Sequence, residues 1–198
     1  KKADQKIESA IHLMSNQKIL IFVSSGRVFS LDPNILPSGK SNPKSIFYFI
    51  DAITNDKLVG IIKAETNKFC ILVSERGKGF VSEISSMLTN QKKGKQIFNL
   101  KSSDVLVKVL ECNKNHLASV NKSGKLLIID IKNLPILQKG GGVQVIKIKE
   151  GDALSDIKLI DLSEGLSWKT GSKVRNITDI KFWIGKRAQS GKKVPKFF

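Results

Sequence analysis

Short apolar runs alternate with glycine and small polar residues along most of the chain, and this pattern predicts β-strands. The runs are rich in β-branched and aromatic residues, and Gly, Ser, Asn or Asp bounds each of them. The expected strands cover residues 19–23, 28–31, 46–50, 69–73, 97–100, 105–110, 125–131 and 143–148. Helical periodicity is not sustained over any long segment, so we expect an all-β protein.

One glycine recurs between two apolar runs in the middle of each repeated segment. These glycines are Gly26, Gly77, Gly124 and Gly171, at steps of 51, 47 and 47 residues. Glycine readily adopts the positive φ that a tight connection requires, so each is expected to form a hairpin turn. The chain is therefore expected to be built from repeated hairpins.

Two further series have nearly the same period. Asp56, Asp104 and Asp152 each precede an apolar run at steps of 48 residues, and Gly94 and Gly142 are also 48 residues apart. An aspartate that recurs once per unit favours a turn or capping role over a catalytic one. Repeats of ~40 to 50 residues with four strands have the size of a propeller blade.

We expect a single domain over residues 1–198, a β-propeller of about four to five four-stranded blades of roughly 48 residues. The expected repeat units are 17–66, 67–115, 116–162 and 163–198, the first enlarged and the last incomplete. The first residue is Lys1 and no apolar leader follows it, so we expect a fragment of a longer chain.

The net charge of the chain limits the classes of binding partner that we expect. Lys and Arg number 34 against 17 Asp and Glu, a net charge of +17 that attracts nucleic acid, an anionic membrane or an acidic protein. Only four of the basic residues are Arg, which favours binding to a phosphate backbone over the reading of bases. No apolar run approaches 18 residues, so no membrane span is expected. The two cysteines lie in no metal-ligand spacing and are expected to be free thiols in a reducing cytosol.

Basic residues recur in register just after the hairpin glycines and within the second glycine clusters. Equivalent positions of successive blades lie on one rim, so a repeated Lys would form a curved positive stripe suited to duplex DNA. The alternative is that these lysines only solvate the surface. The candidate DNA-binding residues are Arg27, Lys40, Lys78, Lys92, Lys93, Lys95, Lys125, Lys139, Lys173, Arg187, Lys192 and Lys193.

No catalytic or metal site is expected. Glycines 140–142 lack the strand-to-helix context of a phosphate-binding loop, so a turn is expected there. His12 and His116 are isolated from any metal-ligand pattern. With only two His and dispersed acids, no hydrolytic triad can be assembled.

The aromatic residues mostly fall in apolar runs. Tyr48, the single tyrosine, lies within the run 46–50 and is expected to be a core or half-buried strand residue rather than a nucleophile. Trp168 and Trp183 lie in strand-like runs and are expected in the core.

Four strings carry a resemblance to a known family. Segments 26–31 (GRVFSL), 34–40 (NILPSGK), 86–100 and 133–148 resemble the C-terminal domain of the A subunit of bacterial DNA topoisomerase IV, as does the ending at 183–198. The DNA gyrase A subunit shares this repeat. The resemblance spans nearly the whole chain and implies a broken β-propeller, or β-pinwheel.

Gyrase and topoisomerase IV differ in the gyrase A-box, Q-R-R-G-G-K-G. The similar segment here keeps Gln91, Lys92, Lys93 and Gly94 but continues with Lys95, where the box has a second Gly. This degenerate form resembles topoisomerase IV and implies that tight DNA wrapping is lost.

The resemblance implies a non-catalytic, bacterial, cytoplasmic and nucleoid-associated domain that binds and bends duplex DNA without sequence preference. It would present DNA to the catalytic core of its own subunit, in a heterotetramer with the ATPase B subunit, for relaxation, decatenation and chromosome segregation. No cofactor is expected in this fragment, because ATP and magnesium would bind other domains. The alternatives are a gyrase wrapping domain and a propeller scaffold that binds an acidic protein, which would not bind duplex DNA.

Overall fold

The computed structural model describes residues 10–14, 16–37, 41–42 and 44–195, and their regular elements are β-strands and short 3₁₀ helices. The strands are β1 (Ile19–Val23), β2 (Arg27–Leu31), β3 (Leu58–Lys63), β4 (Phe69–Ser74), β5 (Lys78–Glu83), β6 (Lys95–Gln96), β7 (Leu106–Glu111), β8 (His116–Asn121), β9 (Lys125–Asp130), β10 (Val143–Gln144), β11 (Leu154–Ile160), β12 (Leu166–Thr170), β13 (Lys173–Ile177) and β14 (Lys192–Lys193). The 3₁₀ helices are η1 (Pro33–Ile35), η2 (Ile46–Tyr48), η3 (Ile84–Met87), η4 (Ile131–Asn133) and η5 (Lys181–Trp183).

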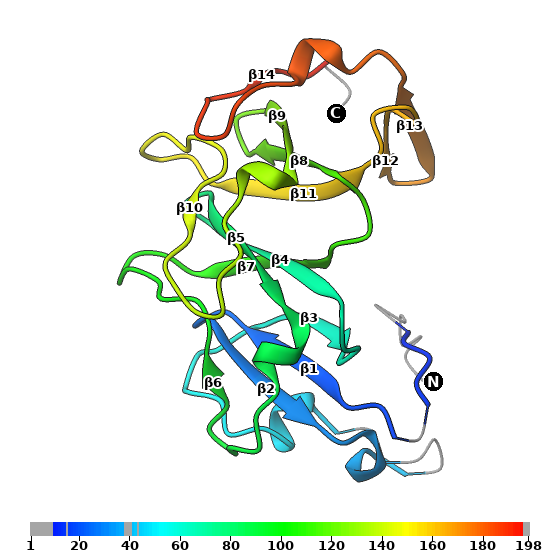
Figure 1. The fold of residues 1–198 in the computed structure, drawn as a ribbon, viewed down its shortest axis with the longest axis vertical. Helices are drawn as coiled ribbons and strands as arrows, with labels where there is room; N and C mark the ends of the chain where they lie inside the picture. The colour runs from blue at the N-terminus through cyan, green and yellow to red at the C-terminus, as the bar shows by residue number, and fades with distance from the viewer. Residues whose placement is uncertain (1–9, 15, 38–40, 43, 196–198) are drawn as a thin grey trace, which may run out of the picture.

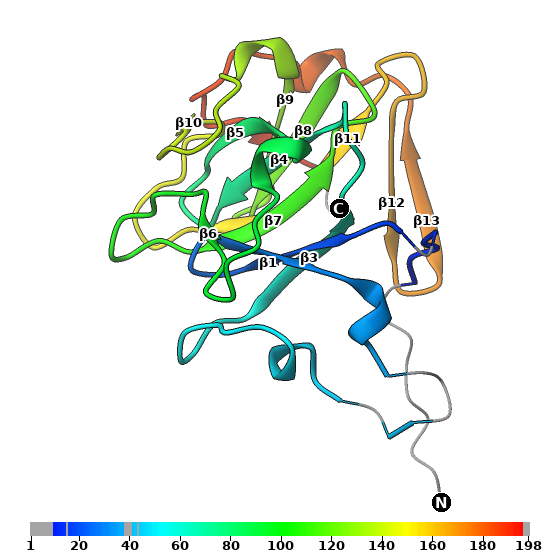
Figure 2. The same cartoon turned by 60° about the horizontal axis from the view of Figure 1, so that its bottom comes forward.

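The described strands form four antiparallel sheets, which confirms the all-β, propeller-like class. Three sheets have four strands, in the orders β3-β1-β2-β6, β10-β5-β4-β7 and β11-β8-β9-β14, and we call them the first, second and third blades. The fourth sheet contains only the hairpin β12–β13. The blades follow one another from the bottom of Figure 1 to its top, and the last hairpin lies beside the third blade. Figure 2 shows this hairpin at the right of the molecule, on the opposite side from β6 and β10.

In each four-stranded blade, one edge strand comes from the following repeat of the chain, and we call β6, β10 and β14 the outer strands. The short strand β6 comes after the β4–β5 hairpin in the chain but pairs with β2 of the first blade. In the same way β10 pairs with β5, and β14 pairs with β9. The three outer strands lie along the left and upper side of Figure 1. Successive blades are thus joined by strand exchange.

The outer strands are shorter than predicted, and most of the expected strand 97–100 is wrong. Pairing stops at Gln96 because the backbone N–H groups of Ile97 and Phe98 both donate to the carbonyl of Gly26, each at 3.0 Å. The chain then leaves the sheet edge, and the side chains of Ile97 and Phe98 are fully buried.

The core lies between the blades. Leu72 on β4 packs with the first blade in a cluster that includes Phe80 and Phe98, whose ring centroids are 5.0 Å apart. Its neighbours Ile71 and Val73 point the other way, into the cluster shared with the third blade. Because both faces of the middle sheet are covered, β4 is a continuous apolar run rather than an alternating one.

The hairpin glycines have the conformation that their sequence positions predicted. Gly26, Gly77, Gly124 and Gly171 have φ values of 83°, 76°, 76° and 60°. At Gly77 a Cβ atom would also lie 2.5 Å from the carbonyl oxygen of Ile146, so both conformation and space require glycine there.

The repeated aspartates hold the hairpin turns, which confirms their predicted turn role. Asp56 accepts from the backbone N–H of Ser25 at 2.9 Å. Asp104 accepts from the Ser74 hydroxyl at 2.6 Å and from the Arg76 backbone N–H at 3.1 Å. In the third blade Asp152 accepts from the hydroxyl and the backbone N–H of Ser123, at 2.8 and 3.2 Å.

Asp152→Asn is expected to lower the free energy of unfolding by about 1 kcal/mol near pH 7, because the charged acceptor of the turn is lost. Burial opposes ionisation, but hydrogen bonds from Ser123 and Ala153 and the nearby Lys125 charge hold the pKa of Asp152 below its ordinary value of 3.8. A lowered carboxylate pKa stabilises the fold above the unfolded pKa, and this contribution is lost as pH falls through the folded pKa.

Urea titrations from pH 7 to pH 3 would test this prediction. The gap between wild type and variant should be full above about pH 5 and should close as the medium becomes more acidic than about pH 4. The exposed Asp51→Asn is the matched control. A gap that is independent of pH would contradict the role of the charge.

Two aromatic predictions need correction. The expected strand 46–50 is wrong, since its first three residues form η2, and Tyr48 is 70% exposed rather than core or half-buried. The 48-residue step places Tyr48 at the position of Gln96 on β6, but the described chain has no earlier blade for this segment to join. The two tryptophans, Trp168 and Trp183, were expected in the core but are half-buried, and they pack against a buried cluster that includes Ile128.

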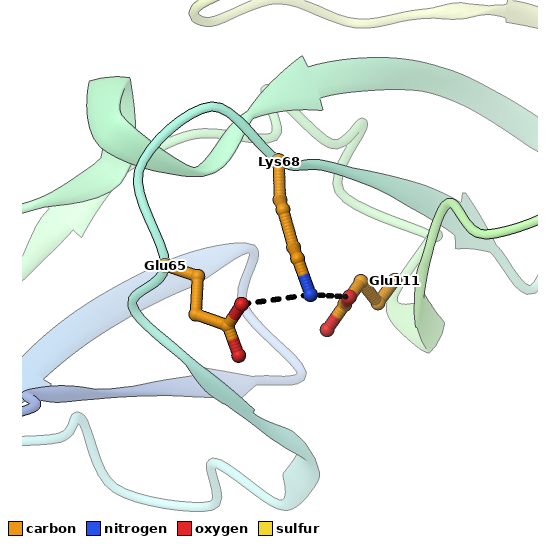
Figure 3. A network of polar contacts seen from close by, with 3 residues as sticks. All are labelled: Glu65, Lys68 and Glu111. Carbon is orange, nitrogen blue, oxygen red and sulfur yellow. Dashed lines mark hydrogen bonds and ion pairs between the residues drawn. The ribbon is translucent and has the colours of Figure 1, made fainter. Parts of the chain in front are cut away.

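An exposed ion-pair network lies at the junction of the first two blades (Figure 3). The Lys68 ammonium, just before β4, lies 2.7 Å from Glu65, which follows β3, and 3.0 Å from Glu111 at the end of β7. The hydrogen bond from Lys68 lowers the pKa of Glu65.

Candidate nucleic-acid interface

Three loops lead into the three outer strands, and we call residues 88–94, 136–142 and 184–191 the interblade loops. Each crosses the second hairpin strand of the preceding blade. The N–H of Thr89 donates to the Ser30 hydroxyl at 2.9 Å. At the equivalent places Leu137 donates to the Val81 carbonyl at 2.8 Å, and Gly185 donates to the Ile128 carbonyl at 2.9 Å. The three loops therefore occupy equivalent positions on successive blades.

Neighbouring interblade loops are connected through the segments that follow the outer strands. Gly140 in the second loop donates to the Ile97 carbonyl at 3.0 Å and accepts from the Asn99 N–H at 2.8 Å. In the third loop Ala188 donates to the Val145 carbonyl, and the Gln189 carbonyl accepts from Lys147, both at 2.9 Å. These bonds make one continuous rim along the outer strands on the left and upper side of Figure 1.

The outer surface of this rim is positively charged. None of the three interblade loops contains Asp or Glu. The exposed basic residues on the loops and on β14 are Lys92, Lys93, Lys139, Lys186, Arg187, Lys192 and Lys193. Sequence reasoning missed Lys186, although Arg187 follows Lys139 by the 48-residue step and Lys186 is its neighbour.

Two of the predicted DNA-binding residues are half-buried and bond to backbone carbonyls in the first loop or in η3 just before it. The half-buried guanidinium of Arg27 donates to the carbonyl of Lys93 at 2.6 Å. The half-buried Lys95 ammonium donates to the Ser86 carbonyl at 2.6 Å. Arg27 therefore holds the backbone of the loop that exposes Lys92 and Lys93, whereas Lys95 holds η3, which directly precedes that loop.

The other predicted residues are divided between the rim and more distant places. Lys78 and Lys125 are half-buried on the second hairpin strands, opposite Gln144 and Lys193 of the outer strands. Lys173 is exposed on β13 of the last hairpin. Lys40 lies outside the described residues.

Glycines 140–142 end the second interblade loop directly before β10 instead of forming the expected turn, and Gly140 makes a β-bridge with Phe98. Gly142 has a φ of 67°, and a Cβ atom there would lie 2.7 Å from the carbonyl oxygen of Gly79. Close approach to β5 and the backbone conformation both account for glycine at this position.

Both cysteines are free, Cys70 buried and Cys112 half-buried. Burial raises the pKa of the Cys112 thiol to about 12, which keeps it protonated at neutral pH. In the part of the chain that the structure describes, His, Cys, Asp and Glu side chains form no group of three that could hold a metal ion. No helix among the described residues has the length and apolar composition of a membrane span.

Solved structures with the same fold are C-terminal domains of the A subunits of topoisomerases. The E. coli ParC C-terminal domain matches with a TM-score of 0.84 at 20% identity, over 99% of this chain and 84% of that one. The DNA gyrase A C-terminal domain matches with a TM-score of 0.68 at 15% identity, over 93% of this chain and 63% of that one. By fold the chain is a β-pinwheel domain like these two structures.

Sequence comparison gives a narrower result. No family model matches the chain. It is 35% identical over 184 residues to the A subunit of DNA topoisomerase 4 from Rickettsia bellii, covering 93% of this chain and 25% of that protein. It is 31% identical over 198 residues to the corresponding protein of Caulobacter vibrioides, covering 100% of this chain and 26% of that protein. The chain therefore belongs to the family of topoisomerase IV A subunits, as expected, and spans about a quarter of the length of these relatives.

Proposed function

We propose that this domain binds duplex DNA along the rim of interblade loops and bends it, as the non-catalytic DNA-binding part of a topoisomerase IV. The observation that carries the proposal is the rim itself, in which acid-free loops from successive repeats are hydrogen-bonded into one basic surface. Lysine and arginine there can neutralise phosphates regardless of sequence.

Bending is a consequence of the rim's shape in this proposal. The outer strands of three blades follow one another along a curved edge in Figure 1, so a duplex that contacts all three must curve. Bending 20 to 30 base pairs costs of order 1 to 6 kcal/mol, which several phosphate contacts can offset.

We infer the role of the whole protein from its relatives. This domain would present DNA to the catalytic core of its own subunit, in a heterotetramer with the ATPase B subunit. The parent enzyme would use ATP and magnesium in other domains to relax and decatenate DNA during chromosome segregation, at the nucleoid in the bacterial cytoplasm. The departures from the gyrase box after Gly94 favour topoisomerase IV over a gyrase wrapping domain.

Fluorescence anisotropy with a duplex of about 40 base pairs tests the DNA-binding proposal. Affinity should fall by roughly 10³ or more between 50 and 200 mM salt, as expected for six or more phosphate contacts. Two duplexes of unrelated sequence should give the same curve. Failure to bind at 50 mM salt would reject the proposal and favour a scaffold for an acidic protein.

Arg27→Ala is expected to weaken duplex binding about fivefold in the wild-type domain but less than twofold in a Lys92→Ala, Lys93→Ala background. The reason is that Arg27 holds the carbonyl of Lys93 and acts through the loop. Anisotropy on the four proteins of this cycle measures the coupling. Lys57→Ala, on an exposed residue of another segment, is the control. Equal losses in both backgrounds would show that Arg27 contacts DNA directly.

A further inference from the structure

The pairing of the outer strands differs between the third blade and the first two. In all three blades the residue that follows the hairpin glycine is basic, and it faces a residue of the outer strand. Arg27 faces Gln96 in the first blade, and Lys78 faces Gln144 in the second. In the third blade Lys125 faces Lys193 instead. The first two blades therefore pair a basic residue with glutamine, and only the third of these blades pairs two lysines.

The two glutamines fasten the outer strands to the hairpin turns. The amide nitrogen of Gln96 donates to the carbonyls of Ser25 and Phe98, at 2.9 and 2.7 Å. The amide nitrogen of Gln144 donates to the carbonyls of Arg76 and Ile146, both at 2.7 Å. The same pair of hydrogen bonds recurs in two blades, so glutamine at this position stabilises the pairing of the outer strand with the hairpin.

In the third blade a second lysine takes that place and introduces a like-charge pair. Directly opposed residues of antiparallel strands lie on the same face, and like charges there destabilise the pairing. Lys193 is exposed and Lys125 is half-buried, so the pair opens to solvent at the rim. The Asp152 carboxylate attracts Lys125 and offsets part of this repulsion, while it accepts hydrogen bonds from Ser123 and Ala153.

The backbone around Lys193 is nonetheless held in place. The indole N–H of Trp183 donates to the Lys193 carbonyl at 3.1 Å, and the next residue, Val194, donates to the Gly124 carbonyl at 3.0 Å. These bonds keep β14 on β9 and fix the two lysine backbones relative to one another. An anion held between the two ammonium groups would convert their repulsion into attraction to a shared partner.

We propose that Lys125 and Lys193 form a phosphate-binding subsite at the outer edge of the third blade. This inference rests on the proposed function, because the phosphate would be one of the duplex backbone. In the third blade a lysine replaces the glutamine that hydrogen-bonds to the hairpin turn. This position therefore favours binding of an anion over the stability of the fold. A phosphate bound there also attaches β14 more firmly to the blade.

Lys193→Gln separates binding from stability, and Lys192→Gln is its matched control. Lys192 is an exposed lysine of the same strand that faces Leu126, so its replacement removes the same charge without relieving a like-charge pair. It also removes the contact of the ammonium with the Phe182 ring, 4.2 Å from the ring centroid, which can only lower Tm. Lys193→Gln should raise Tm by roughly 1–3 °C in chloride buffer, because the repulsion is relieved and the glutamine pattern is restored. Lys192→Gln should not raise Tm.

Inorganic phosphate is the first probe. At matched ionic strength it should raise the Tm of the wild type and of Lys192→Gln above the value in chloride, and Lys193→Gln should lose that increment. The subsite is refuted if the increment persists in Lys193→Gln or if Lys192→Gln loses it equally. This arm needs no DNA binding, so it judges the subsite even if the proposed function fails.

Duplex binding is the second probe and identifies the source of the phosphate. Lys193→Gln should weaken binding about threefold to tenfold and should lower the slope of log affinity against log salt by about 0.9, the value for one phosphate contact. If phosphate stabilisation is lost while duplex affinity is unchanged, the subsite takes free phosphate and its assignment to the DNA backbone is rejected.

Discussion

Reversing three charges on the first two interblade loops, Lys92→Glu, Lys93→Glu and Lys139→Glu, is expected to weaken duplex binding at least 100-fold at about 0.1 M salt. The three side chains are exposed on acid-free loops, so each reversal replaces attraction to phosphate by repulsion. The loss of three phosphate contacts should also lower the slope of log affinity against log salt by about 2.7. Anisotropy over a salt series measures both quantities.

A control with the same change in net charge separates the rim from the general field of the protein. Lys57, Lys122 and Lys169 are exposed and lie outside the interblade loops. Their reversal to Glu should weaken binding far less. Lys68 would be unsuitable, because a glutamate there would join Glu65 and Glu111 (Figure 3). Equal losses in the two triple variants would refute the rim as the binding surface.

Gly142→Ala is expected to lower the free energy of unfolding by about 3 kcal/mol and Tm by roughly 6–12 °C. The positive φ of 67° is unfavourable for alanine, and the new Cβ would lie 2.7 Å from the Gly79 carbonyl oxygen and 2.9 Å from its carbon. Neither atom can move without shifting β5, the strand to which the following residues pair.

Gly151→Ala isolates the contribution of backbone conformation. Gly151 has a similar φ of 77°, but a Cβ atom there meets no atom within 4 Å. We expect that variant to lose only about 1 kcal/mol. Urea denaturation of both variants gives the two free energies. Similar losses would show that the close approach to Gly79 contributes nothing.

Local chemistry made the hairpins predictable from the sequence, whereas pairing between repeats was not predictable. Gly77 acts on its own turn, and its residue type carries that information. Asp104 holds the same turn from 28 to 30 residues away, and its turn role was predicted from its residue type and its recurrence at the 48-residue step. The outer strands β6 and β10 have two residues each, too few for a hydrophobic pattern to specify a partner. Strand exchange is therefore visible only in the structure.

The candidate interface shows the same division between local and long-range information. The exposure of Lys92 and Lys139 follows from their places in glycine-containing loops, as the sequence predicted. Arg27 is equally basic, but its partner is a backbone carbonyl 66 residues away, and residue type cannot reveal such a contact. Tyr48 was misplaced because its apolar neighbours resemble a strand that has no partner in the described chain.

Strand exchange also determines how such an array can change in length during evolution. Each blade is completed by a strand of the next repeat, so the duplicated segment and the folded blade are different stretches of chain. Inserting one whole repeat at any junction recreates the same junction on both sides and leaves no new sheet edge. A cut at the boundary of a blade would instead remove an outer strand from its neighbour. Lineages can thus vary the number of repeats, and with it the length of the outer rim, without redesigning any contact between blades.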